Sequence, residues 1–553
     1  MEELEQIILH IINEKPESKA QFDDARRKIC SKLKINQPPN RALLSAYQSL
    51  LKNKSIERDE LIEKFIRKAN IRSLSGIAVI TSLVKSYPCP GKCVYCPLEA
   101  RMPKSYLASE PAAARSLSLD FDPYELMLQR IHMLEGNGHP CDKIEYIIKG
   151  GTWNAYTLKY QYWYILESFR ACNNLSRETP TPKTSEEDWT NIPLENLQKA
   201  VEEEQVFNET ADYRIIGLTL ETRPDAISPK TIYHMRQQGC TRIELGLQAP
   251  DNKILEYIKR GHTVEQFYDA IKLLRDAGFK VDLHFMPDLP SSTPEHDVEM
   301  YKSIFENPKL RPDMVKIYPC TVIKSAELAS WLESGKHTPY NEKELFDALL
   351  QMKLLTPRYC RISRLIRDIP SDEVSAGNKI TNLREMLSAK TKEQGKLCVC
   401  LRCREISRQE KNIPKDTVPQ LFVDEYETDG GTEYFITFED PNRISVFGFL
   451  RLRIPEHNND SKEKARLFEL IPEIKNAAFI RELHTYGQLV GIGEKSESAA
   501  QHKGLGKRLV SEAEKISINL GYRKLAVISG VGVKEYYRKL GYEKDGTYMV
   551  KNL

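Results

Sequence analysis

The sequence lacks any run of about 18 consecutive apolar residues, which excludes an ordinary transmembrane helix. Its first residues, Met-Glu-Glu-Leu-Glu-Gln, are acidic and lack the basic and apolar segments of a signal peptide. A dominant charge is also missing, because the net charge is only +3 over 553 residues. We therefore expect a cytoplasmic protein with no membrane partner, in which any contact with nucleic acid depends on local basic patches.

What is present is the composition of a globular protein, with 41% hydrophobic and 29% charged residues. The length predicts three or four domains. The spacing of the twelve cysteines, and the lysines near them, favour metal binding in a reducing compartment over disulfides. We interpret five of the cysteines as small buried apolar residues: Cys30, Cys141, Cys172, Cys240 and Cys360.

The stretch from residue 87 to residue 97 reads Tyr-Pro-Cys-Pro-Gly-Lys-Cys-Val-Tyr-Cys-Pro. Its thiols, Cys89, Cys93 and Cys96, can bind three irons of a [4Fe–4S] cluster and leave the fourth iron without a protein ligand. The amino and carboxylate groups of S-adenosylmethionine can chelate such an open iron. A zinc site would need a fourth ligand nearby, and the loop offers none. The spacing therefore predicts a cluster that binds S-adenosylmethionine.

Strand and helix patterns alternate from residue 72 to about residue 321. Polar residues, glycines or prolines follow each of six apolar runs, at residues 77–84, 143–149, 214–220, 242–247, 281–285 and 314–318. This alternation predicts an α/β fold with a parallel sheet curled into a partial (βα)6 barrel, to which we assign residues 71–355. Functional groups should gather at the carboxyl ends of its strands.

Three other segments flank or interrupt the barrel. Residues 1–70 carry apolar residues at helical spacing among many basic ones, which predicts a basic helical region. Residues 173–208 are rich in acidic residues and predict a partly disordered surface excursion. Residues 356–408 form a basic linker, in which arginines every third residue predict one helical face: Arg358, Arg361, Arg364 and Arg367.

Residues 409–553 predict a separate α/β domain. The stretch 501–508 reads Gln-His-Lys-Gly-Leu-Gly-Lys-Arg and opens a predicted helix, whose first N–H groups can bind a pyrophosphate. It resembles the acyl-CoA motif of the GNAT-type acetyltransferase fold. In that fold a tyrosine at the place of Tyr537 contacts the CoA sulfur or protonates the leaving thiolate. The plainer alternatives are packing roles for Tyr536 and Tyr537, and a core position for His484.

Four further cysteines predict a zinc site. Cys398, Cys400 and Cys403 lie within six residues of one another, and Cys320 follows the sixth predicted strand. Together they could form a four-cysteine zinc centre that ties the barrel to the linker.

Taken together, these features resemble the catalytic subunit of Elongator, including its stand-alone archaeal and bacterial relatives. The resemblance covers nearly the whole chain and rests on the cysteine loop and on residues 75–79, 149–152, 221–225, 286–290, 481–487, 501–506, 526–532 and 536–539. The gap between Cys89 and Cys93 is shorter than in eukaryotic relatives. It implies a prokaryotic or archaeal type that does not require the other Elongator subunits.

The resemblance implies modification of the wobble uridine in the anticodon stem-loop of tRNA, giving 5-carboxymethyluridine. The reduced cluster would split S-adenosylmethionine, and the resulting radical would take hydrogen from the acetyl methyl group of acetyl-CoA. The carbon radical would add to carbon 5 of the uracil, and thioester hydrolysis would leave the carboxymethyl group. An electron donor is a further implied partner.

Roles for particular residues also come from the resemblance. It implies catalytic roles for Cys89, Cys93, Cys96, Lys143 and Tyr537. It places acetyl-CoA on Lys143, Glu482, Leu483, His484, Thr485, Leu505, Gly506, Lys507 and Tyr537, and adds Gly150 and Gly151 as cofactor-binding residues. It implies tRNA contacts from the N-terminal helices and the basic linker.

Two alternatives belong to other functional classes. One is a protein lysine acetyltransferase whose iron–sulfur region is only structural, and the other is a tRNA-binding assembly scaffold without turnover. Three cluster thiols with an open fourth position argue against both.

Overall fold

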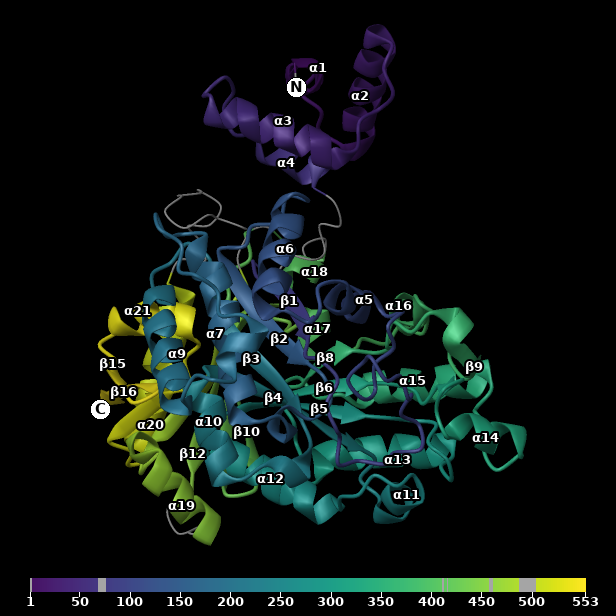
Figure 1. Cartoon of the computed structure of the whole chain (residues 1–553), viewed down its shortest axis with the longest axis vertical. Coiled ribbons are helices and arrows are strands. Elements are labelled where there is room, and N and C mark those ends of the chain that lie inside the picture. The colour runs from purple at the N-terminus through teal and green to yellow at the C-terminus, as the bar shows by residue number, and fades with distance from the viewer. Residues whose placement is uncertain (1, 68–75, 410–411, 415, 457–460, 487–503) are drawn as a thin grey trace.

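The computed structural model describes residues 2–67, 76–409, 412–414, 416–456, 461–486 and 504–553. It shows a helical N-terminal region, a parallel sheet surrounded by helices, and a second sheet of mixed direction (Figure 1). Among these residues, no helix is both long and apolar enough to cross a membrane.

The N-terminal region is helical, as the apolar spacing predicts. Its helices are α1 (Glu2–Asn13), α2 (Lys19–Leu33), α3 (Asn40–Lys52) and α4 (Glu60–Ile66). Their apolar faces close a small core of their own, which includes Ile7, Phe22 and Tyr47. Figure 1 shows this region, in purple, next to the end of the barrel that carries α6.

Seven parallel strands form the barrel sheet in the order β1-β2-β3-β4-β5-β6-β8, so that strands consecutive in the sequence lie side by side. The strands are β1 (Ala78–Leu83), β2 (Lys143–Lys149), β3 (Arg214–Thr222), β4 (Cys240–Gln248), β5 (Lys280–Phe285), β6 (Met314–Ile317) and β8 (Arg361–Arg364). The first six lie where the apolar runs predict them, and the predicted fold class is confirmed.

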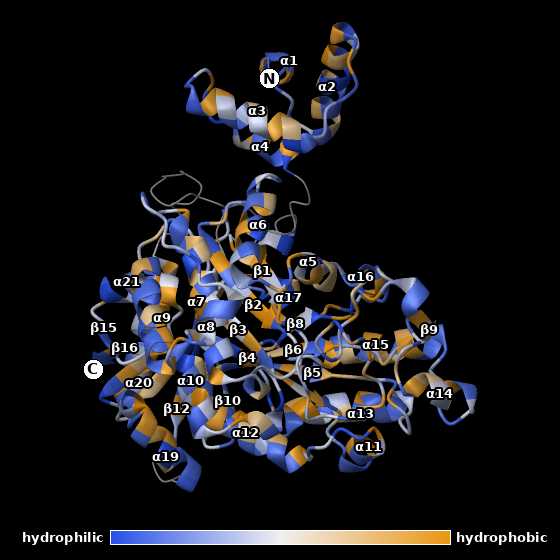
Figure 2. Cartoon of the chain, in the orientation of Figure 1, coloured by the Kyte–Doolittle hydropathy of each residue, from blue (hydrophilic) through white to orange (hydrophobic). Residues whose placement is uncertain are grey.

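Helices connect and cover these strands. They are α5 (Pro111–Ser118), α6 (Pro123–Glu135), α7 (Leu158–Asn174), α10 (Pro229–Gln237), α11 (Asn252–Tyr257), α12 (Val264–Asp276), α13 (Pro294–Glu306), α14 (Leu328–Glu333) and α15 (Glu342–Leu355). The start of α6 matches its sequence signal, because Asp122 accepts the N–H groups of Tyr124 and Glu125 and Pro123 takes the first helical position. Figure 2 shows hydrophobic and hydrophilic residues on different faces of outer helices such as α12.

Strand β8 corrects the prediction for the basic linker. Arg361 and Arg364 lie on a strand that pairs with β6, not on a helical face. Between them, Ile362 is completely buried, and Ser363 donates a hydrogen bond to Asp282 of β5. Pairing with an open sheet edge therefore outweighs the three-residue repeat of arginines. The rest of this segment forms a short strand, β9 (Val374–Ala376), and three helices, α16 (Leu383–Glu393), α17 (Leu401–Arg404) and α18 (Ile406–Gln409). Strand β9 pairs with β7 (Val322–Ile323), which follows β6 in the barrel region.

The prediction of a partly disordered surface excursion at residues 173–208 is also wrong. It holds α8 (Glu186–Trp189) and the long helix α9 (Leu194–Asn208), which packs against α7. Leu197 and Val201 of α9 are 1% exposed, and Asn208 is fully buried. Glu195, Glu202 and Glu203 are exposed, whereas Glu204 is buried and pairs with Arg177 at 3.0 Å. The acidic composition therefore concealed an ordered amphipathic helix.

The second sheet follows the order β10-β11-β12-β13-β14-β16-β15. Its elements are β10 (Gln420–Thr428), β11 (Gly431–Glu439), β12 (Val446–Pro455), α19 (Lys462–Leu470), β13 (Ala478–Thr485), α20 (Leu505–Asn519), β14 (Lys524–Val527), α21 (Lys534–Arg538), β15 (Glu543–Asp545) and β16 (Tyr548–Asn552). All neighbours are antiparallel except β13 and β14, which pair in parallel over only three residues. Beyond Ile480, strand β13 therefore continues without β14 and leaves an opening between them.

The two sheets are joined closely. Gly530 and Gly532, after β14, lie against β3, and a Cβ atom on Gly530 would come within 1.9 Å of the carbonyl oxygen of Ile216. Arg453 of β12 pairs with Asp276 at the end of α12 at 3.1 Å, with both side chains buried. The second sheet is thus held against the amino ends of the barrel strands.

Candidate active site

The cysteine loop follows β1 at the carboxyl end of the barrel. Cys93 and Cys96 are 6% and 8% exposed, and Cys89 is partly exposed. Val94, between them, donates its N–H to the carbonyl of Ile258 at 3.1 Å and accepts the N–H of Leu328 at 2.9 Å. Two distant segments of the chain therefore hold the loop over the mouth of the barrel.

Positive charge surrounds the loop. Arg260 donates a hydrogen bond to Sγ of Cys93 at 3.5 Å. A hydrogen bond from Cys96 and the Arg260 guanidinium together hold the pKa of the Cys93 thiol at about 4, although burial alone would raise it. A Cβ atom on Gly91 would lie 2.4 Å from Nη1 of Arg223, so glycine lets that guanidinium approach the loop. This environment favours the thiolate form of Cys93, whereas the hydrogen bond with Cys93 and burial raise the pKa of the Cys96 thiol.

The donor set fits a cluster better than a single ion. Among the described residues, only Cys398, Cys400 and Cys403 form a group of three metal ligands whose atoms all lie within 4.8 Å of one another. The three thiols of the loop do not all lie within that distance of one another, and three thiolates in one loop are typical ligands of a [4Fe–4S] cluster. The cysteine loop therefore fits a [4Fe–4S] cluster.

A cavity of about 520 Å³ lies in the barrel beside this loop and is lined by Tyr95, Pro97 and side chains from all seven strands. At its centre Glu244 pairs with Lys149 and Lys316 and lies 3.2 Å from Nε2 of His284. Burial would raise the pKa of Glu244, but these cations hold it well below its usual range. Gly150 and Gly151 follow β2 with φ angles of 144° and 87°, and neither lines this cavity.

Sequence analysis missed this charged group. The feature that could have revealed it is the glutamate in the strand Arg-Ile-Glu-Leu-Gly-Leu. Buried parallel strands are normally continuous apolar runs, so a charged residue within one indicates a special role.

A second cavity, of about 1050 Å³, lies between the N-terminal helices, the amino ends of β2 and β3, and the opening beside β13. We call it the donor cleft. Eight of the residues expected to bind acetyl-CoA line it: Lys143, Leu483, His484, Thr485, Leu505, Gly506, Lys507 and Tyr537. Helix α20 begins there after Gly504, whose φ of 87° is in the left-handed region. Gln501, His502 and Lys503 lie outside the described residues.

The ninth expected residue, Glu482, lies elsewhere. It pairs with Arg451 at 2.8 Å and with Lys280 at 3.6 Å, beneath the donor cleft. Burial would raise its pKa, but Lys280 and Arg451 outweigh that effect and lower it to about 2. Glu482 therefore belongs to the contact between the two sheets.

Several residues of the donor cleft carried no motif. Arg58 and Arg67 come from the N-terminal region, and Arg214 comes from β3. Lys539, which belongs to the matched stretch 536–539, also lines the cleft, although no role was predicted for it. The only sequence signal for Arg58 and Arg67 was the excess of basic residues before residue 70. Tyr536 also lines the cleft and is 38% exposed, whereas Tyr537 is 5% exposed.

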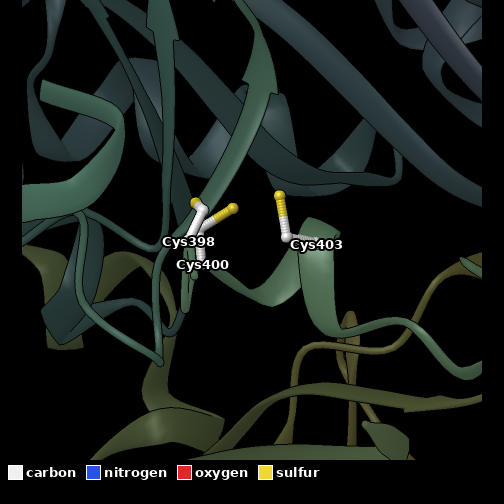
Figure 3. Close-up of side chains that lie close together, drawn as sticks. All are labelled: Cys398, Cys400 and Cys403. Atoms are coloured by element: carbon white, nitrogen blue, oxygen red, sulfur yellow. The ribbon is translucent and has the colours of Figure 1, made fainter. Parts of the chain in front are cut away.

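The linker cysteines come together without Cys320. Figure 3 shows the sulfur atoms of Cys398, Cys400 and Cys403 pointing into a common space. Cys320 is not in this group, and its backbone N–H is bonded to Pro287 after β5. The three thiols fit three of the four positions of a tetrahedral zinc ion, and Cys320 is removed from the predicted set.

Comparison with known proteins places this site in a family. The model of the Radical SAM superfamily matches residues 190–304, and that of the Radical_SAM C-terminal domain matches residues 312–393. The tRNA uridine(34) acetyltransferase of Methanocaldococcus jannaschii is 40% identical over 508 residues, covering 90% of this chain and 88% of the relative. Elongator complex protein 3 of Homo sapiens is 36% identical, covering 87% and 85%.

A solved structure agrees with these relatives. The Elp3 of Methanocaldococcus infernus with an N-terminus deletion (1-46) is 37% identical, with a TM-score of 0.69, and the match covers 87% of this chain and 100% of that one. The predicted resemblance is confirmed by identity at this level along nearly the whole of both chains. This chain belongs to the family of tRNA uridine(34) acetyltransferases and Elongator complex protein 3.

Proposed function

We propose that this chain transfers a group derived from acetyl-CoA to carbon 5 of uridine 34 in tRNA, giving 5-carboxymethyluridine. One observation carries the proposal: a single chain combines a three-thiol loop at the mouth of a barrel with a separate cleft that holds a helix N-terminus, Lys143 and Tyr537. The relatives named tRNA uridine(34) acetyltransferase support the choice of uridine 34.

Cys89, Cys93 and Cys96 hold the [4Fe–4S] cluster and leave one iron for S-adenosylmethionine. When bound and reduced by an external electron donor, the cluster and S-adenosylmethionine would supply radical chemistry that can remove a hydrogen atom from carbon. Arg260, which donates a hydrogen bond to Sγ of Cys93, favours the ionised form of that thiol. Lys149 and Lys316 line the cavity below and share the carboxylate of Glu244, so the barrel offers polar contacts to a substrate.

Acetyl-CoA occupies the donor cleft in this proposal. Residues 504–507 line it, so that free N–H groups of the first turn of α20 are available to phosphates. Burial raises the pKa of Tyr537 well above its usual value, so its hydroxyl stays protonated and can donate to a thiolate. Lys143, at the start of β2, adds a cation from the barrel side.

The N-terminal helices bind the tRNA. Arg27 and Lys28 of α2 have side chains 63% and 64% exposed, as phosphate contacts require. Arg58 and Arg67 bring the same region to the rim of the donor cleft. The anticodon stem-loop would thus lie between the helices that bind its backbone and the domains that act on its base.

Zinc on Cys398, Cys400 and Cys403 would be structural in this scheme. The three thiols lie between β8 and β10 in the sequence, where the chain passes from one sheet to the other. Other Elongator subunits are not needed for any step proposed here.

The test is anaerobic incubation of the purified chain with S-adenosylmethionine, acetyl-CoA, a reductant and tRNA, followed by mass spectrometry of the nucleosides. We expect 5-carboxymethyluridine that disappears when any one component is omitted. A protein lysine acetyltransferase would instead acetylate histone tails without reductant and leave the tRNA unchanged. That result would overturn the proposal.

A further inference from the structure

A third cavity lies between the two described above. It measures about 180 Å³ and lies between the amino ends of the barrel strands and the free part of β13. We call it the middle cavity. Gly217 of β3, Thr241 of β4 and Lys280 of β5 line it from the barrel, and Leu483 and His484 line it from the second sheet.

The middle cavity shares walls with both neighbours. Leu483, His484 and Tyr537 line it and the donor cleft alike. At its other end Glu145, Arg242, Met314 and Arg361 line it and the barrel cavity alike. The three cavities therefore lie in a row, separated only by side chains that they share, from the donor cleft past the amino end of the barrel to the cysteine loop.

One ion pair lies across the second junction. Nη1 of Arg242 is 2.5 Å from Oε1 of Glu145, and the same nitrogen lies 3.6 Å from the sulfur of Met314. The side chains of Arg242 and Glu145 are 10% and 25% exposed. Because β2 and β4 are not adjacent in the sheet, this pair bridges the space in front of β3.

The walls also present unused polar atoms. Nε of Arg242 and Nε2 of His484 are buried and make no hydrogen bond within the described part of the chain. A thioester carbonyl can accept a hydrogen bond from Nε of Arg242, and from Nε2 of His484 in the tautomer that carries its hydrogen on that nitrogen. An acetyl group is small enough for a space of this size. Buried donors without partners are costly unless something accepts from them.

We propose that the middle cavity is the internal passage through which the acetyl end of acetyl-CoA enters the barrel, and that Glu145 and Arg242 form its gate. This inference rests on the proposed function, because it explains how a donor held by the second sheet meets a radical formed at the cysteine loop. The proposal predicts that a side chain that fills the middle cavity stops product formation, while the donor cleft and the cysteine loop each keep their own function.

Gly217 allows a direct test. A Cβ atom there would lie 3.8 Å from Oγ1 of Thr241 and 4.0 Å from Cγ of Glu145, so a side chain fits and points into the middle cavity. Gly217→Leu should reduce the rate of 5-carboxymethyluridine formation more than tenfold. Gly217→Ala, the matched control, should stay within threefold of the wild type.

Three further measurements separate a blocked passage from a damaged protein. The Gly217→Leu variant should keep its iron content, form 5′-deoxyadenosine, and bind CoA, which lacks the acetyl group, within threefold of the wild type. A product rate in Gly217→Leu equal to that in Gly217→Ala would overturn the passage. Absence of product with the wild-type chain would overturn the proposed function, and the passage with it.

A second pair of variants approaches the cavity from the neighbouring strand. Thr241 lines the middle cavity but neither of the other two. Thr241→Leu enlarges the side chain, and Thr241→Val keeps its shape. We expect Thr241→Leu to lose product and Thr241→Val to retain it. If Gly217→Leu fails to fold, normal product from a folded Thr241→Leu variant would by itself overturn the proposal.

Discussion

Arg481 and Asp313 form a doubly hydrogen-bonded ion pair between the two sheets. Nη2 of Arg481 donates to Oδ1 of Asp313 at 2.5 Å, and Nη1 donates to Oδ2 at 2.8 Å. Arg481 lies in β13, and Asp313 directly precedes β6, so the pair spans the contact between the sheets. Neither side chain is more than 1% exposed. Arg481 further donates to Glu433 at 3.0 Å, which completes a buried network.

Replacing Arg481 by methionine should destabilise the whole chain. The change leaves buried Asp313 without its main partner and Glu433 with Arg453 alone, and breaking such a buried pair typically costs about 3–5 kcal/mol. We expect a lower midpoint of urea-induced unfolding. Lys343→Met is the control, because Lys343 is 90% exposed in its pair with Asp347 and such pairs contribute about 1 kcal/mol or less. Equal midpoints for the two variants would contradict the prediction.

Replacing Cys93 by alanine should remove one ligand of the cluster. We expect loss of bound iron and of 5′-deoxyadenosine formation, with tRNA binding unchanged because the basic helices are elsewhere. Cys30→Ala removes a buried thiol from α2, in the separate N-terminal core, and should retain both iron and activity. A Cys93 variant that still cleaves S-adenosylmethionine at the wild-type rate would disprove the cluster assignment.

Replacing Gly506 by aspartate should weaken acetyl-CoA binding. A Cβ atom there would lie 2.5 Å from the hydroxyl of Tyr536, and the added carboxylate would repel phosphates at the start of α20. We expect more than a tenfold loss in affinity, or more than about 1.4 kcal/mol, by calorimetry. Ser511→Asp adds the same charge to an exposed position of α20 and serves as control. Equal affinities for the two variants would place the donor elsewhere.

The linker cysteines predict zinc without Cys320. The anaerobic protein should contain about one zinc per chain, and Cys400→Ser should lose it, as measured by metal analysis. Cys320→Ser should keep its zinc, because Cys320 lies outside the group of three thiols. Loss of zinc in the Cys320 variant, or none in the wild type, would argue against this site.

Asp288 predicts a specific dependence of stability on pH. Its side chain is 1% exposed, and burial, reinforced by Asp297, raises its pKa to about 8. A raised pKa means that the folded state binds the extra proton, so the stabilisation is complete below about pH 4 and is lost as the pH rises toward 8.

The variant Asp288→Asn tests this sign. Asparagine tolerates the φ of 66° at this position, and it does not titrate. Between pH 5 and pH 7 the free energy of unfolding of the wild type should fall, relative to the variant, by about 1.4 kcal/mol per pH unit. Parallel curves for the two proteins would show that Asp288 is ionised in the folded state.

Much of the fold could be predicted because β-branched apolar runs and capping residues are local signals. The failures have a common cause in tertiary contact. Strand β8 has only Ile362 as a buried apolar residue, and the spacing of its arginines is that of a helix. Its strand conformation comes from pairing with the edge of the sheet at β6, a tertiary contact that the sequence does not reveal. In α9 a buried stripe at Leu197 and Val201 is masked by the glutamates on its outer face.

In the candidate active site, the motifs located the cluster thiols and the start of α20. The spacing of these cysteines and glycines could be read because the ligand that they would bind determines it. Sequence could not place Arg58, Arg214 and Lys539 in one cleft, since they come from three separate elements. Nor could sequence show that Cys320 lies away from the other three cysteines. A cysteine that follows a strand looks the same in the sequence whether it binds a metal or only packs in the core.

The way the cysteine loop is held has a consequence for biosynthesis. Val94 is bound by Ile258 and Leu328, both of which leave the ribosome long after the loop itself. At roughly 5–20 residues per second, the wait for Leu328 is on the order of tens of seconds. During this interval the nascent chain exposes Cys89, Cys93 and Cys96 without their cover. Iron–sulfur assembly factors therefore have a co-translational window for loading, and a chain that is released without its cluster must reopen this cover to receive one.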